Sequence, residues 1–149
     1  MHKVSTISDF FIAFSHECGD PLSNLKLQKL LYYAQAWHLA IFDEPLFGDQ
    51  IEAWVHGPVV VPEYHRFKGW AWQPIRDNPQ LPEIDQRTVE HLNEVMEVYG
   101  AKNAYELELL THQEDPWKNA RGGIPIDQSS NTVVSHEDMK KFYRARMNG

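Results

Sequence analysis

Apolar residues recur at helical spacing in several stretches of the chain, and the first stretch lies close to the N-terminus. Ile7, Phe10, Phe11 and Phe14 follow the order i, i+3, i+4, i+7, which places them on one face of a helix. Thr6 is a candidate N-cap for this helix. The sequence CGDP that follows the stripe predicts where the helix ends.

The longest helical pattern spans about residues 24–42. Its apolar stripe comprises Leu27, Leu30, Leu31, Ala34, His38 and Ile41. Tyr33 and Trp37 widen the stripe beyond half of the circumference, while Lys26 and Lys29 fall on other faces. A helix with such a broad apolar surface is expected at the centre of the core. We expect the ring of His38 to be hydrogen-bonded inside this core rather than to ligate a metal.

Residues 46–61 lack a helical period and contain a β-branched run after Gly57-Pro58. This pattern predicts an extended segment with a short strand or two. Pro62 suits the first turn of the next helix, which carries Tyr64 and Phe67. The proline-rich stretch at 73–85 predicts a loop.

Cap residues mark the remaining helices. Asp85 opens one that Gly100 ends, and Asn103 with Glu106 forms a capping box for a helix through about Leu110. A short turn follows at Asp115-Pro116-Trp117, and the last helix begins at Ser135. The predicted fold is mostly α, a single compact helical domain over residues 1–149. It has six or seven helices and a short extended or β segment near residues 46–61.

Composition and charge narrow the classes of function. A chain of 149 residues is long enough to bury a core without metal or disulfides, and its single cysteine fits a reducing cytoplasm. Neither a signal peptide nor an apolar run long enough to cross a membrane is present. The net charge of −7 argues against direct nucleic-acid binding and suits a basic partner.

Candidate chemistry is sparse. His16, Glu17 and Cys18 adjoin in sequence, but neighbours on a helix point to different faces, so we predict no metal site and no cofactor. Cys18 is better interpreted as a small buried residue than as a nucleophile. His56 and His112 are better interpreted as residues that fix loops. The glutamates of the later helices, including Glu106, Glu108 and Glu114, indicate a solvated face.

Three motifs occur in an order that resembles the Panacea domain, the SocA-like antitoxin family also described as phage-associated GepA-like proteins. They are LKLQKLLYYAQAWHLA at 25–40, LFGDQIEAWVHGPVV at 46–60 and LLTHQEDPW at 109–117. The resemblance covers nearly the whole chain. It departs from the family at one place, because the expected proline lies one position earlier than Pro62.

The resemblance implies an antitoxin of a toxin–antitoxin operon, often on a phage or mobile element, that neutralises its toxin by direct protein contact and is not an enzyme. Its partner is then a cognate toxin encoded next to it. The predicted partner-binding residues come from all three motifs: Lys29, Tyr32, Trp54, His56, Gly57, Pro58, His112 and Trp117. The same residues are also what a well-packed core corner would contain.

Two alternatives stay open. SocA-like relatives imply a proteolytic adaptor that delivers its toxin to the ClpXP protease. A hydrolase that uses His56 and His112 would require both rings within hydrogen-bond distance of a carboxylate or of Cys18.

Overall fold

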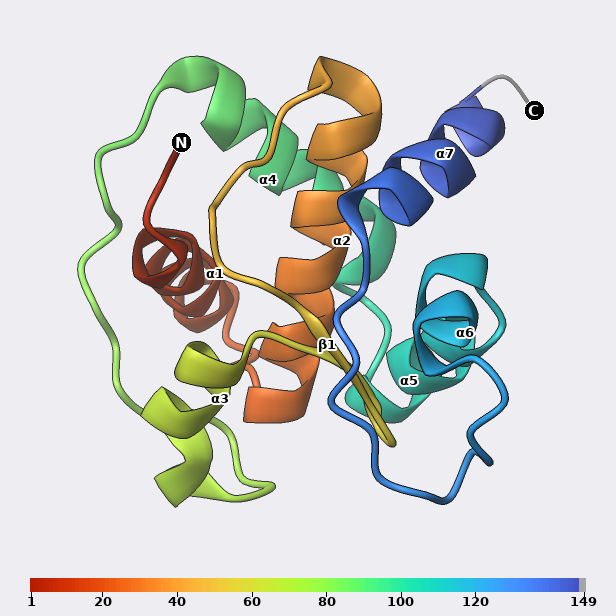
Figure 1. Cartoon of the computed structure of the whole chain (residues 1–149). Coiled ribbons are helices and arrows are strands. Elements are labelled where there is room, and N and C mark those ends of the chain that lie inside the picture. The colour runs from red at the N-terminus through yellow and green to blue at the C-terminus, as the bar shows by residue number, and fades with distance from the viewer. Residues whose placement is uncertain (148–149) are drawn as a thin grey trace.

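The computed structural model describes residues 1–147 and contains seven α-helices, a 3₁₀ turn and one β-hairpin. Figure 1 shows the long helix α2 running through the middle, with α1 and α3 on one side and α5, α6 and α7 on the other. The predicted mostly α domain, with its short β segment, is confirmed. The elements are α1 (Val4–Glu17), α2 (Asn24–Phe42), β1 (Glu52–Trp54), β2 (Gly57–Val59), α3 (Val61–Phe67), η1 (Lys68–Trp70), α4 (Gln86–Tyr99), α5 (Ala104–His112), α6 (Asp115–Arg121) and α7 (His136–Met147).

Helix α2 is the centre of the core, as its broad apolar surface predicts. Every residue from Lys26 to Ala36 is buried, because α1, α4, α5, α7 and the hairpin pack around the helix. The Ser23 hydroxyl caps its start by accepting a hydrogen bond from the Lys26 amide. The assignment of Lys29 to a face away from the core is wrong, since its side chain is fully buried, and Ile41 of the predicted stripe is 41% exposed.

The boundaries of α1 differ from the prediction at both ends. The helix begins at Val4, so Thr6 lies inside it, and the N-cap position is Lys3, which makes no side-chain cap. Cys18 follows the last turn and is exposed, so its assignment as a buried residue is wrong. The apolar stripe itself is confirmed, because Ile7, Phe10 and Phe11 are buried.

The predicted caps are largely confirmed. Asp85 accepts a hydrogen bond from the Thr88 amide at 3.0 Å, and Asn103 and Glu106 form both bonds of a capping box. Gly100 does end α4, but with φ −64° it is not the left-handed C′ residue that its position suggested. The residues after Asp115 continue as the helix α6 rather than as a short turn.

The hairpin confirms the extended segment predicted near residues 46–61. Its strands are antiparallel, with Ala53 opposite Pro58 and Trp54 opposite Gly57. The chain at 132–134 pairs with the other edge of β1, where the Ala53 amide donates to the Thr132 carbonyl at 2.8 Å. Strand β1 is therefore held on both edges. None of the helices described is both long and apolar enough to cross a membrane.

Candidate partner-binding site

Two polar side chains of α2 hold the hairpin against the central helix. Gln28 Oε1 accepts a hydrogen bond from the Val60 amide at 2.9 Å. Lys29 Nζ donates to the Pro58 carbonyl at 3.4 Å. Both side chains are fully buried. They satisfy backbone groups of β2 and of Val60, directly after it, that would otherwise be buried without partners. This explains why polar residues interrupt the leucines of the first motif.

Gly57 allows β2 to approach α2 this closely. Its φ of +109° is one that residues with a side chain rarely adopt. A Cβ atom built there would lie 2.6 Å from Lys29 Cε and 3.1 Å from Thr111 Oγ1. Glycine is therefore required both for the turn of the backbone and for the contact with the helix.

Lys29 is an unusual charged group for a protein core. Burial lowers the pKa of its ammonium group from 10.5 to about 7, and the nearby Glu108 carboxylate counteracts part of this effect. Near neutral pH the amine is thus close to its midpoint, and its uncharged form, which burial favours, is well populated.

The third motif supports the hairpin from the opposite side. Trp117 Nε1 donates to the Trp54 carbonyl at 2.9 Å, and the His112 ring stacks on Trp117 with 4.1 Å between centroids. Arg121 donates to the Ala53 carbonyl at 3.1 Å and also to the carbonyls of Pro125 and Gln128. The α5–α6 corner therefore fixes both β1 and the loop that follows α6.

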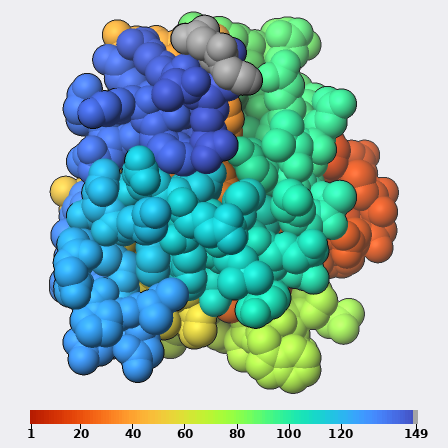
Figure 2. Space-filling view, turned by 90° about the vertical axis from the view of Figure 1, so that its right-hand side faces the viewer, coloured from red at the N-terminus to blue at the C-terminus, as the bar shows by residue number. Residues whose placement is uncertain are grey.

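The turn of the hairpin reaches the surface. Figure 2 shows its yellow tip exposed between α5 and the blue loop after α6. At this tip His56 is exposed, and its Nδ1 lies 3.0 Å from Glu108 Oε1. Burial lowers the pKa of His112 further along α5, which favours its neutral form.

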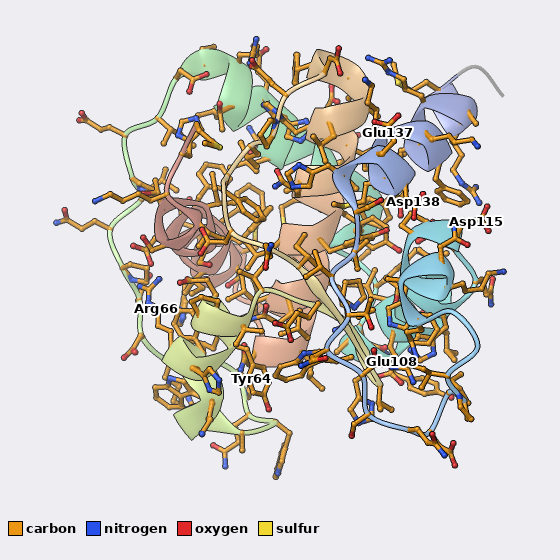
Figure 3. The ribbon with its side chains drawn as sticks, viewed as in Figure 1. Tyr64, Arg66, Glu108, Asp115, Glu137 and Asp138 are labelled. Carbon is orange, nitrogen blue, oxygen red and sulfur yellow. The ribbon has the colours of Figure 1, made fainter. Side chains whose placement is uncertain are left out.

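A groove of about 670 Å³ lies along the hairpin. Two aromatic side chains line it, Trp54 from β1 and Tyr64 from α3, with ring centroids 5.0 Å apart and nearly perpendicular planes. Both are only partly buried. Glu52 and the loop residues 129–131 complete much of its wall. Figure 3 shows Tyr64 and Glu108 on opposite sides of the hairpin.

The structure brings seven of the eight predicted site residues together around the hairpin: Lys29, Trp54, His56, Gly57, Pro58, His112 and Trp117. Lys29, Gly57, Pro58 and Trp117 are buried and form a frame. Trp54, His56 and His112 keep surface that a partner could reach.

Tyr32 lies elsewhere, one turn further along α2. It is fully buried, and its hydroxyl is 3.1 Å from that of Tyr143 on α7. Glu114 Oε1 accepts hydrogen bonds from Tyr33 at 2.6 Å and Tyr143 at 3.1 Å. Burial raises the pKa of Glu114, whose assignment to a solvated face is therefore wrong.

Several residues of the corner were not predicted as site residues. Glu108 belongs to the acidic set that indicates a solvated face, and the local sequence gives no sign that Arg121 or Glu52 has a structural partner. Tyr64 follows the second motif, in the helix that Pro62 opens, and is not among the predicted site residues. The spacing of Tyr64 from Gly57-Pro58 is the sequence signal that could have indicated a place beside the hairpin.

The arrangement offers little support for catalysis. His56 has its carboxylate partner, but it lies at an exposed tip, and Cys18 is at the end of α1, outside this corner. His112 Nε2 is buried and has no hydrogen-bond partner among the described residues. Over residues 1–147, no group of three or more His, Cys, Asp or Glu side chains is placed to hold a metal ion.

Comparison with protein-family models identifies the family. The family model described as "Antitoxin SocA-like, Panacea domain" matches residues 27–118, which run from α2 into α6. The matched range contains the buried face of α2, the whole hairpin and the α5–α6 corner. Searches of curated proteins and of solved structures gave no match.

Proposed function

The chain belongs to the SocA-like antitoxin family defined by the Panacea domain, and from this membership we propose that it neutralises a cognate toxin by binding it directly. The family supports an antitoxin-related, non-enzymatic role. The toxin is proposed to be encoded beside it and to meet it in the cytoplasm. The surface around the hairpin is proposed as the binding site.

The groove beside the hairpin is the main support for proposing this surface as the toxin-binding site. Partly exposed aromatic side chains on a rigid support are typical of binding hot spots, because little side-chain entropy is lost when a partner covers them. Trp54 meets this description, since its carbonyl is held by Trp117 and its indole donates to Glu52 at 3.0 Å. Tyr64 provides the adjoining ring.

Co-expression with the neighbouring gene tests the proposal. The neighbour alone should stop growth, and the wild-type chain should restore it and co-purify with the neighbour. A neighbour that is harmless alone would remove the main support for the antitoxin role.

Two single substitutions locate the binding surface. Trp54→Ala and Tyr64→Ala should each weaken binding by about 30-fold or more, the loss of about 2 kcal/mol typical of a hot-spot residue. Trp72→Ala is the matched control, because Trp72 is 80% exposed and does not line the groove. If Trp54→Ala and Tyr64→Ala bind the toxin as tightly as Trp72→Ala does, the toxin binds to another surface. Melting temperatures and circular dichroism establish that each variant is folded.

The same cells separate direct inhibition from proteolytic delivery. Direct inhibition gives a stable complex and an amount of toxin that does not depend on ClpXP. An adaptor would instead lower the amount of toxin, and removal of ClpXP would restore it.

A further inference from the structure

The groove beside the hairpin has the chemistry of a site for one cationic side chain. Its walls contain a single carboxylate, that of Glu52, and no lysine or arginine lines it over the described residues. Among the lining residues, His56 is the one side chain that can become positively charged. Its Nδ1 already lies 3.0 Å from Glu108 Oε1. A cation that enters the groove therefore meets one carboxylate and no opposing fixed cation.

The Glu52 carboxylate is held in position for such a contact. Trp54 Nε1 donates to its Oε1 at 3.0 Å, and this indole is its only side-chain donor in the part of the chain that the structure describes. Glu52 is paired with Val59 across the hairpin, so its backbone is fixed in the sheet. The second carboxylate oxygen, Oε2, makes no side-chain hydrogen bond within the described residues.

Two aromatic rings lie beside this carboxylate. Trp54 and Tyr64 both line the groove, with 5.0 Å between their centroids and an angle of 68° between their planes. The negative faces of aromatic rings attract cations, and tryptophan attracts them most strongly. A guanidinium group suits the combination better than an ammonium group does. It is planar and stacks on a ring while it donates hydrogen bonds to a carboxylate in the same plane.

We propose that this groove accepts an arginine side chain of the partner protein, with the guanidinium against Trp54 and Tyr64 and bonded to Glu52. This inference rests on the proposed function in one respect, because the proposed function makes the partner a protein. The net charge of −7 would also draw a basic partner towards the chain.

A titration that does not require the toxin tests the site. The probe is the peptide acetyl-Gly-Arg-Gly-amide, compared with the same peptide containing citrulline, which is nearly isosteric but neutral. Binding is followed by the ¹⁵N NMR signal of the Trp54 indole N–H, which Trp54→Phe identifies among the five tryptophans of the chain. We expect a saturable shift with the arginine peptide and an affinity for the citrulline peptide at least fivefold weaker.

Two variants establish the origin of the preference. Glu52→Gln keeps the groove's shape and should bring the two peptides to within twofold of each other. Glu137→Gln, which removes the same charge from exposed α7 (Figure 3), should leave the preference unchanged. Equal binding of arginine and citrulline by the wild-type chain, or an unaltered preference in Glu52→Gln, would overturn the proposal. Equal binding of the matching lysine peptide would overturn the choice of a guanidinium.

The outcome is distinguishable from failure of the proposed function. If the groove does not prefer arginine, the wild-type chain can still restore growth against its toxin. If the neighbouring gene product is harmless, the peptide titration still reports on the groove.

Discussion

Lys29 makes the stability of this protein depend on pH in a window where few other groups titrate. Its ammonium group is fully buried, and burial lowers its pKa from 10.5 to about 7. The difference corresponds to a penalty of about 5 kcal/mol for carrying the charge in the folded state. The penalty is present in full well below pH 7, and it disappears as the pH rises towards 10.5.

The sign follows from proton binding. Between pH 7 and pH 9 the unfolded chain keeps the Lys29 proton and the folded chain releases it, so the unfolded state binds more protons. The free energy of unfolding therefore rises with pH, at about 1 kcal/mol per pH unit and by about 2 kcal/mol over this window. Lys29→Met keeps a long apolar side chain without the charge, and this variant should lose the rise.

The assay is urea unfolding at pH 7, 8 and 9 at constant ionic strength, followed by circular dichroism. The difference between the wild type and Lys29→Met isolates Lys29, because groups shared by both proteins cancel. Lys26, whose pKa burial also lowers, is one such group. Tyr99, whose pKa burial raises to about 12, titrates above the window. A difference that stays constant or falls with pH would refute the reasoning.

Three further substitutions test the frame around the hairpin. Gly57→Ala should lower the free energy of unfolding by about 2–3 kcal/mol, because φ is +109° and the new Cβ would lie 2.6 Å from Lys29 Cε. Glu114→Leu should cost about 2–4 kcal/mol, since two buried tyrosine hydroxyls lose their shared acceptor. Arg121→Met should cost about 2–3 kcal/mol and should speed amide exchange in residues 122–131, the loop whose Pro125 and Gln128 carbonyls Arg121 binds.

Each of these variants has a matched control in the chain, and urea unfolding measures all of them. Gly69→Ala adds a Cβ where nothing lies within 4 Å, Glu137→Leu alters an exposed acid, and Arg76→Met alters an exposed arginine. All three should change the free energy of unfolding by less than about 0.5 kcal/mol. A test variant that behaves like its control would show that the contact at issue does not stabilise the fold.

The sequence by itself determined the helices, most of their ends and the place of the hairpin. These features depend on neighbours within a few positions. The stripe of Ile7, Phe10 and Phe11 specifies one helical face, and Asp85 and Asn103 bond to amides three residues away. The three motifs also indicated the family and predicted that distant segments meet. The prediction of Thr6 as the N-cap is wrong because the helix begins at Val4, about one turn earlier. The residues before Thr6 contain no cap signal that would mark this start, since Lys3 makes no side-chain cap.

Only the tertiary structure decided which polar groups are buried and which motif residues share a site. Lys29 and Glu114 look like surface charges locally, but their partners lie 29 and 81 positions away. Tyr32 follows Lys29 by one turn of α2, yet α7 covers the former and the hairpin covers the latter. Burial of a charge depends on what packs against it. A periodic pattern records which face of a helix is apolar but not which element will cover a given turn.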